Sequence, residues 1–300
     1  MKKLLLVAML LGCACGDTDS AAPEDNAVRE ESEACDRACL IRTAQAVFER
    51  HELADGARFT ENGQEIALKD SWLANASDVQ FHNAYADEHA EQVLVVGTGM
   101  DGEAKAAIFG LRAKIHAAKA EELELLVTRE GEASLFPPML PLETDARFDE
   151  TVPKAGPSDG ATMIKLANRY FDGIQAAGDP GLPVAEGCNR VENGVQTTRN
   201  PRFNDLRCNT LEVFVYIPVV EQRRFPIIDE ERGVAVAIVV FQIPGGDYEY
   251  ELNGQTVMRS YTPRSLYLFE AFKVSDGVIQ HIEATMRNLD YGAKIDWPLK

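Results

Sequence analysis

The feature that most constrains this 300-residue chain is that its two halves carry similar motifs in the same order. Each half opens with apolar residues at helical spacing, Leu40–Phe48 in the first and Met163–Ile174 in the second. A Glu-Asn-Gly triplet follows in both halves, beginning at Glu61 and at Glu192. Because repeated motifs in a constant order indicate repeated structure, we infer two related folding units.

The later parts of the two halves also correspond. The matching segments are 93–96 with 234–241, 110–115 with 270–274, and 123–125 with 282–284. Each half therefore reads as an opening helix, a turn-rich linker and three or four long strands, with a hairpin turn at Ser275–Gly277. This order predicts an α+β fold. The unit boundary is expected within residues 137–160, and the second unit carries an insertion around residues 200–210.

The first residues predict export. Lys2 and Lys3 precede the apolar run Leu4–Leu11, which is far shorter than the roughly 20 residues that span a bilayer. The segment from Leu10 to Cys13 resembles the bacterial lipobox, which implies lipid attachment at Cys13 and a membrane-anchored envelope protein, with Ala14 favouring the outer membrane. An ordinary secretory signal is the alternative. Residues 1–12 would be the signal peptide and 13–34 a flexible acidic tether.

The formal net charge of −18 opposes nucleic acid and anionic membrane surfaces as partners, and favours neutral or cationic small ligands. Export also places the cysteines in an oxidising compartment. We expect a disulfide between Cys188 and Cys208, which flank a loop rich in Asn, Arg and Pro. A link between Cys35 and Cys39 is open, although helical geometry suits that spacing poorly.

Two stretches carry a family resemblance. The helix Ala167–Asp172 and the late hairpin 270–284 resemble the nuclear transport factor 2-like superfamily, which includes SnoaL-like cyclases and ketosteroid isomerases. The resemblance implies two tandem cones, at residues 35–145 and 158–300, with helices packed on curved antiparallel sheets. Such cones often pair through their sheets, so it also implies a pseudo-dimer of the two units, or a homodimer. Arg190–Gly194 is similar to a segment of uncharacterised secreted fungal and bacterial proteins.

The last strand supplies the first candidate site. Alternation from Val278 places His281, Glu283 and Arg287 on one face, where an imidazole and a carboxylate could act as base and acid. The first unit has Glu122 and Glu124 at the positions of His281 and Glu283. The alternative is that this face meets solvent or the other unit, with Arg287 neutralising Glu283.

The second candidate group surrounds the Glu-Asn-Gly triplet. Asn193 suits a tight turn, whereas Glu192 has two readings, a capping carboxylate or a pocket carboxylate. Arg190 is its ion partner or a substrate-binding residue, and Tyr170 lies on the apolar stripe of the second helix with its hydroxyl available at a pocket mouth.

These residues lead to two hypotheses. The first is a cofactor-independent lyase or isomerase of the dehydratase type, acting on a small apolar molecule with His281, Glu283, Glu192 and Tyr170 as catalytic residues. Arg190, Asn193 and Arg287 would bind the substrate. The second is a non-catalytic ligand-binding or interaction lipoprotein. The sequence contains no phosphate loop, dinucleotide fingerprint, nucleophile elbow or metal-ligand spacing, and we expect no cofactor or metal.

Overall fold

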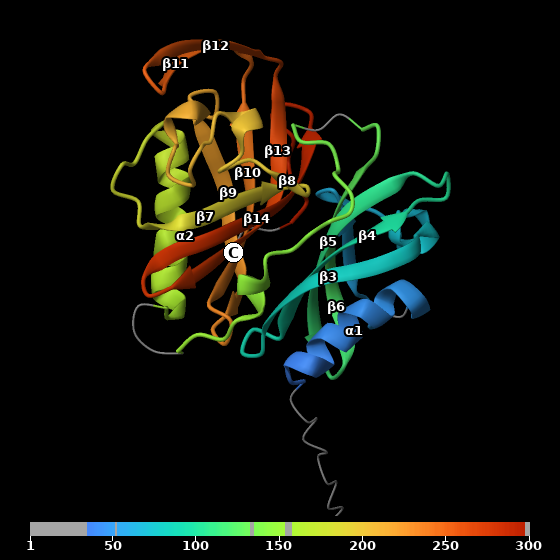
Figure 1. Cartoon of the computed structure of the whole chain (residues 1–300). Coiled ribbons are helices and arrows are strands. Elements are labelled where there is room, and N and C mark those ends of the chain that lie inside the picture. Colours follow the sequence, from blue (N-terminus) through green and yellow to red (C-terminus); the bar gives the residue numbers. More distant parts are fainter. Residues whose placement is uncertain (1–34, 52, 133–134, 154–157, 298–300) are drawn as a thin grey trace, which may run out of the picture. The chain divides into compact units, whose positions relative to one another are not determined.

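A computed structural model describes residues 35–51, 53–132, 135–153 and 158–297. The signal peptide, the tether and Cys13 lie outside these described residues. Residues 34–300 form one compact body that contains both repeated units (Figure 1).

The first unit is one helix and one sheet. Helix α1 (Arg37–Arg50) begins after Asp36, whose side chain accepts a hydrogen bond from the backbone N–H of Cys39 and so caps the helix. Two short 3-10 turns, η1 (Leu68–Asp70) and η2 (Leu73–Asn75), precede the long strands. In the order β2-β1-β6-β5-β4-β3, the sheet comprises β1 (Arg58–Glu61), β2 (Gln64–Glu65), β3 (Ser77–Asp87), β4 (Gln92–Met100), β5 (Ala106–His116) and β6 (Lys119–Arg129).

The second unit repeats this plan. Helix α2 (Gly160–Gln175) is capped by Asp159 in the same way. The sheet order β8-β7-β14-β13-β10-β9 matches the first sheet strand for strand. Its strands are β7 (Val184–Glu192), β8 (Val195–Gln196), β9 (Val219–Asp229), β10 (Val234–Ile243), β13 (Arg264–Ser275) and β14 (Val278–Leu289).

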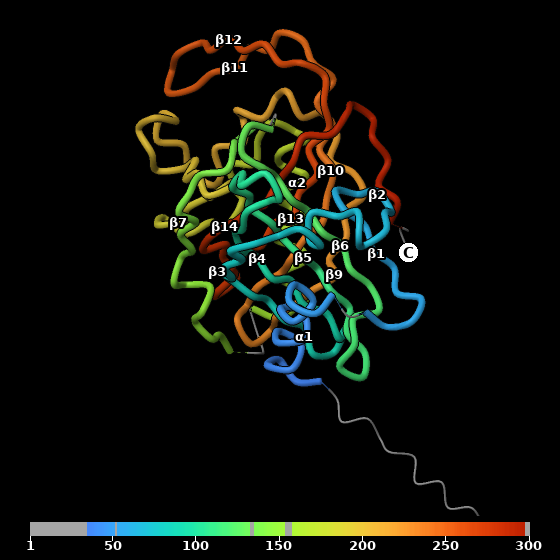
Figure 2. Tube along the Cα trace, turned by 90° about the vertical axis from the view of Figure 1, so that its right-hand side faces the viewer, coloured from blue at the N-terminus to red at the C-terminus, as the bar shows by residue number. Residues whose placement is uncertain are grey.

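The register confirms that the two halves repeat. Glu61 pairs with Leu125 on β6, and Glu192 pairs with Ala284 on β14, so the two triplets occupy the same place in their sheets. The second unit adds a separate two-stranded hairpin of β11 (Gly246–Leu252) and β12 (Gln255–Tyr261). Its linker before β9 is longer than the one before β3 and carries the turns η4 (Pro201–Phe203) and η5 (Glu212–Phe214) where the first unit has η1 and η2. Figures 1 and 2 both show the hairpin at the upper end of the second unit. Sequence reasoning found the insertion near residues 200–210 but missed this hairpin.

The expected α+β fold of cones with helices packed on antiparallel sheets is wrong. The described residues contain two α-helices, of 14 and 16 residues, against two six-stranded sheets. Both sheets are mixed, because β1 runs parallel to β6 and β7 runs parallel to β14. The linkers before β3 and β9 form short 3-10 turns rather than helices.

The packing of the sheets explains this outcome. All ten residues of β10 are buried, so both faces of that strand need an apolar partner. One face packs with α2 in the core of the second unit. The other face shares a cluster with the first sheet, to which Tyr85, Leu94 and Leu126 contribute. A second sheet therefore covers the face that more helices would otherwise cover.

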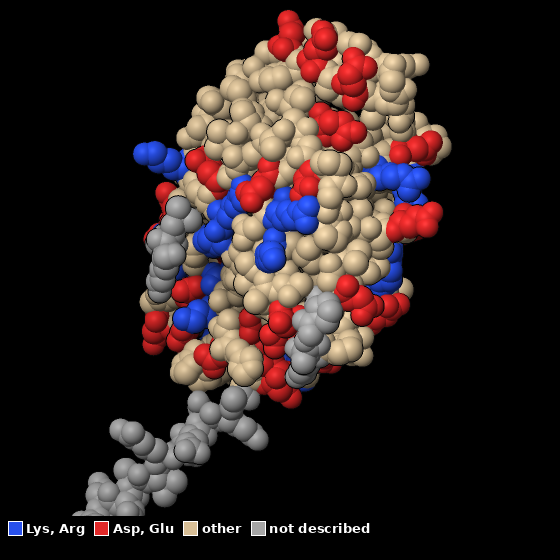
Figure 3. Space-filling model, turned by 90° about the vertical axis from the view of Figure 1, so that its left-hand side faces the viewer, with Lys and Arg blue, Asp and Glu red and all other residues tan. Residues whose placement is uncertain are grey.

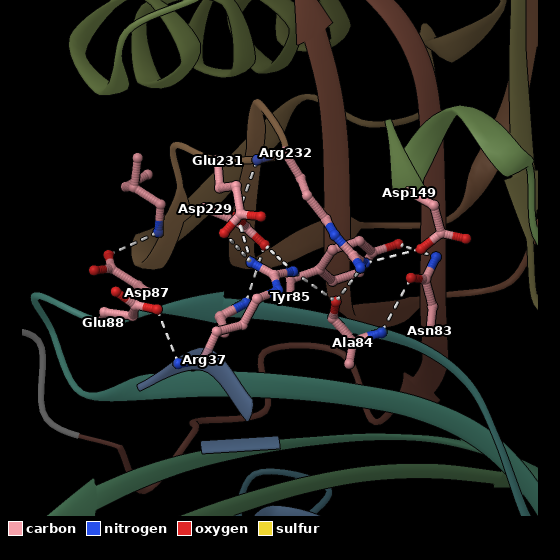
Figure 4. A network of polar contacts seen from close by, with 12 residues as sticks. Arg37, Asn83, Ala84, Tyr85, Asp87, Glu88, Asp149, Asp229, Glu231 and Arg232 are labelled. Atoms are coloured by element: carbon pink, nitrogen blue, oxygen red, sulfur yellow. Dashed lines mark hydrogen bonds and ion pairs between the residues drawn. The ribbon is translucent and has the colours of Figure 1, made fainter. Parts of the chain in front are cut away.

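Buried ion pairs join the two units at two places. At the first, Arg37 on α1 donates to both carboxylate oxygens of Asp229, at 2.8 and 2.7 Å, and the backbone N–H of Ala86 donates to the same side chain (Figure 4). At the second, Arg224 donates to both oxygens of Glu124, at 3.1 and 2.5 Å. The Tyr267 hydroxyl also donates to this fully buried carboxylate. Because the charges are matched, both clusters have a structural explanation.

The expected disulfide between Cys188 and Cys208 is confirmed. Cys35 and Cys39 also form a disulfide, with their Cα atoms 5.2 Å apart. The reasoning that helical geometry disfavours this pair was wrong, because Cys35 precedes the capping residue and is free of helical geometry. In the part of the chain that the structure describes, no helix has both the length and the apolar character to cross a membrane.

Candidate functional site

The second unit contains a pocket of about 190 Å³ between the end of β7, the loop before β9 and the β11–β12 hairpin. Aromatic side chains dominate its wall: Phe136, Phe203, Phe214, Tyr216, Tyr250 and Tyr261. Tyr216 and Tyr261 stack with ring centroids 3.9 Å apart, which ties the hairpin to the loop. Apolar walls with a few convergent polar groups are typical of small-molecule sites.

Three buried polar residues line this pocket, Arg190, Glu192 and Thr197. Together with the buried Tyr170, which Arg190 contacts, and the buried Glu270, which strand register places near Glu192, they form what we call the floor cluster. Tyr170 and Glu270 do not themselves line the pocket. Arg190 lies 3.5 Å from the Glu192 carboxylate and donates to the Tyr170 hydroxyl at 3.3 Å. The Thr197 hydroxyl donates to Glu192 at 2.6 Å. Arg190 is only 2% exposed, so a guanidinium is held inside the unit by these contacts and by the Phe214 ring, 4.8 Å away.

Glu270 is the member that sequence reasoning missed. It pairs with Ala284, which pairs with Glu192, so the three residues form one row across β13, β14 and β7, with the small alanine between two carboxyl groups. Glu270 is 2% exposed, and its Oε2 has no hydrogen-bond partner among the described residues. Burial, together with the negative charge of Glu192, raises the pKa of the Glu270 carboxyl to about 8. A carboxyl group that holds a proton near neutral pH therefore lies in the same strand row as Glu192, which lines the pocket.

Burial also raises the pKa of the Tyr170 hydroxyl, and Arg190 opposes that shift. The phenol is therefore a hydrogen-bonding group of the floor cluster rather than an anion at neutral pH.

The first unit shows that the fold does not require these polar groups. By strand register and helix capping, Val47, Phe59 and Leu111 occupy the positions of Tyr170, Arg190 and Glu270. All three belong to the hydrophobic core of the first unit. The same scaffold is thus stable with apolar residues at these three positions, where the second unit has a phenol, a guanidinium and a carboxyl group. This contrast within one chain indicates a ligand site rather than a folding requirement.

The two glutamates of the repeated triplets also differ. Glu61 accepts a hydrogen bond from the backbone N–H of Trp72 at 2.6 Å and pairs with Arg129 at 3.1 Å, which is the capping role. Glu192 lines the pocket instead. The capping interpretation therefore applies to Glu61 in the first unit, and the pocket interpretation applies to Glu192 in the second.

Asn193 has a structural task. Its side-chain oxygen accepts from the backbone N–H of Met286, and Asn62 accepts from Val127 at the equivalent place. Both asparagines have positive φ angles near +50°, and the glycines that follow them have φ angles of +80°. Each asparagine thus closes a turn and fastens it to the last strand, away from the floor cluster.

The other predicted residues lie on the opposite face of β14. His281 is 1% exposed, with Arg147 and Asp145 at 3.1 and 3.3 Å from its Nδ1. Glu283 accepts from the backbone N–H of Asp145, in the segment that connects the units. Arg287 donates to the backbone carbonyl of Val127 in the first unit.

The structure therefore brings Tyr170, Arg190 and Glu192 together and separates them from His281, Glu283 and Arg287. The His281 face thus meets the connecting segment and, through Arg287, the first unit, as the alternative had it in part. The expected pairing of Arg287 with Glu283 is wrong, because Arg287 pairs with Glu132. Asp145 beside Arg147 also has its pKa lowered to about 2, chiefly by the hydrogen bond from that guanidinium.

A signal for Glu270 was present in the sequence. On β13 the side chains of Leu266, Leu268, Phe272 and Val274 all enter the core of the second unit, and Glu270 stands in the middle of that alternation. A carboxyl group inside an apolar face needs a partner or a function.

Comparison with known proteins gives little further direction. Residues 157–286 match the model of a family described as a domain of unknown function (DUF8021). This region contains the floor cluster. No curated protein matches the chain. Among the described residues, no group of three or more histidine, cysteine or acidic side chains is arranged to hold a metal ion.

Proposed function

We propose that the second unit binds a small, largely apolar organic molecule in the aromatic pocket and moves a proton on it by acid–base chemistry of the lyase or isomerase type. The observation that carries this proposal is the floor cluster, in which Tyr170, Arg190 and Glu270 stand where the first unit has apolar core residues. A cavity of about 150 Å³ in another protein admits benzene, so a pocket of about 190 Å³ has room for one substituted ring.

The two carboxyl groups suit different roles. Glu192 lines the pocket and accepts the Thr197 hydroxyl, as expected of a carboxylate that can act as a base. Glu270 holds its proton near neutral pH and keeps a second negative charge out of the floor cluster. We assign Glu192 as the group that contacts the substrate and Glu270 as a positioning residue that tunes it. His281 has no part in this site.

Binding without chemistry is the second candidate. It is favoured by the engagement of Glu192, whose Oε2 already meets both Thr197 and Arg190. A carboxylate held in this way recognises a hydroxyl or amide donor as well as it removes a proton.

One experiment tests both candidates. Acetophenone carries a ring and a methyl group that exchanges protons next to its carbonyl. We expect the folded full-length protein to bind it and to accelerate deuterium uptake at that methyl group, as followed by proton NMR in D₂O. We expect Glu192→Gln to lower the exchange rate by about a hundredfold, the usual contribution of a positioned base.

Glu61→Gln is the matched control, because it makes the same change at the equivalent position of the first unit. Binding without accelerated exchange would support the second candidate and refute the first. Failure of acetophenone, benzyl alcohol, cyclohexanone and benzoate alike to bind would refute both.

We also propose that the chain is exported and carries a lipid on Cys13. The two disulfides support an oxidising compartment. Mass spectrometry of the amino-terminal peptide of mature protein should show a diacylglyceryl group. Cys13→Ser should move the protein from the membrane fraction to the soluble fraction, and an unmodified Cys13 in membrane-bound protein would contradict the proposal.

A further inference from the structure

We propose that the ligand of this pocket is a carboxylate, with its ring between the aromatic walls and its anionic group at the mouth between Arg202 and Arg259. This inference rests on the proposed small-molecule site and specifies the ligand class. It opposes the expectation from net charge, which favoured neutral or cationic ligands.

Both arginines lie on segments that distinguish the second unit from the first. Arg202 belongs to η4, within the linker 197–218 that corresponds to the shorter linker 66–76. Arg259 lies on β12, in the hairpin that replaces the short turn 101–105 between β4 and β5. The two additions to the repeated fold therefore each bring a guanidinium to the lining of one pocket.

The register of the hairpin places Arg259 and the hairpin's acidic side chains on opposite faces. Arg259 pairs with Tyr248, and Val257 pairs with Tyr250, so these residues share the face that includes pocket-lining Tyr250. The carboxylates alternate onto the other face: Asp247, Glu249 and Glu251, all exposed. Figure 3 shows acidic groups on the surface at the upper end, where Figure 1 places the hairpin. Although the chain has a net charge of −18, the hairpin places Arg259 towards this pocket and its carboxylates away from it.

The two arginines at the mouth of the pocket have no carboxylate partner in the part of the chain that the structure describes. Among the described residues, no carboxylate lies within 4.0 Å of the Arg202 or Arg259 guanidinium, whereas Arg190 is matched by Glu192. The Arg202 guanidinium is placed by the Phe203 ring, 5.7 Å away, instead of by an ion pair. Two unmatched guanidinium groups at the edge of an aromatic pocket suit a ring that bears a carboxylate, because the planar fork binds that group through two hydrogen bonds.

Three probes that share one ring test the inference: benzoate, benzyl alcohol and benzylamine. Binding to the folded full-length protein is measured by NMR titration at about 0.05 M salt, where screening of exposed charges is weak. We expect benzoate to bind most tightly and benzylamine most weakly. Arg202→Gln and Arg259→Gln should each weaken benzoate binding about threefold, and together about tenfold, as exposed ion pairs do. Neither change should affect benzyl alcohol.

Arg207→Gln is the matched control, since Arg207 is an exposed residue of the same linker that does not line the pocket. It makes the same change in net charge and should leave benzoate binding unchanged. If benzyl alcohol binds as tightly as benzoate, or if the control weakens benzoate as much as the mouth variants do, the carboxylate inference is overturned while the proposed pocket stands. If no probe binds, the proposed function fails as well.

Discussion

Replacing Glu270 by glutamine is the sharpest test of the floor cluster. The substitution keeps the size of the side chain and removes its ability to ionise. In the folded protein the Glu270 carboxyl has a pKa of about 8, raised by burial and by Glu192, whereas the ordinary value is 4.5. Between these two values the folded state holds a proton that the unfolded state has lost. The free energy of unfolding of the wild type must therefore fall as pH rises through this window.

The magnitude follows from the two pKa values. Each unit of difference is worth about 1.4 kcal/mol, so the full loss approaches about 5 kcal/mol above pH 8, of which roughly half falls between pH 5 and pH 7. Glu270→Gln removes this contribution. We expect the variant to be more stable than the wild type at neutral pH, by about 3 kcal/mol, and to show a flatter dependence on pH. Such a gain would mean that the wild type keeps a destabilising group for its function.

Urea unfolding of both proteins with disulfides intact, at several pH values between about 5 and 8, measures this difference. Titrating groups that do not interact with Glu270 contribute equally to both proteins and cancel. Glu249→Gln, which removes an exposed carboxylate on the hairpin, controls for the change in net charge. A constant stability difference between Glu270→Gln and the wild type across this range would refute the assignment of Glu270 as a proton-holding group.

Three further predictions concern other parts of the molecule. Replacing Cys188 and Cys208 by serine opens a link between residues 20 apart and should lower the free energy of unfolding by about 3 kcal/mol in denaturant titrations; an unchanged midpoint would contradict this. Glu124→Leu leaves the half-buried Arg224 guanidinium without its carboxylate and should cost about 3 kcal/mol in the same assay, so a loss below about 1 kcal/mol would argue against a stabilising role of this ion pair between the units. His281→Gln should leave probe binding and deuterium exchange in the pocket unchanged, because the imidazole faces the connecting segment. A large loss of exchange would show that His281 does take part in the reaction.

The repeat and its register could be read from the sequence because they depend on local patterns. Matching triplets and matching apolar runs place Glu61 and Glu192 at equivalent positions, and the strand pairing confirms this. The Cys188–Cys208 link also followed from the export signal and the loop between the two residues. Alternation likewise separated His281 from Ile282 on the last strand.

The alternation of polar and apolar residues along a strand does not show which neighbour each face of the strand packs against. The face with His281 is polar and looked like a pocket wall, but it packs against the connecting segment and the first unit. The apolar-looking face holds the floor cluster, because Glu270 and Arg190 interrupt it at positions that meet only when β13, β14 and β7 are in register.

The sequence alone therefore determined the two related units, the order of their elements and one disulfide, since each depends on residues near one another along the chain or on repetition. Tertiary structure decided the rest. It buried the second face of each sheet against the other sheet, which removed the need for more helices. It also brought Tyr170, Arg190, Glu192 and Glu270, from a helix and two strands far apart in the chain, into one cluster, and burial there, with the charge of Glu192, raises the pKa of the Glu270 carboxyl.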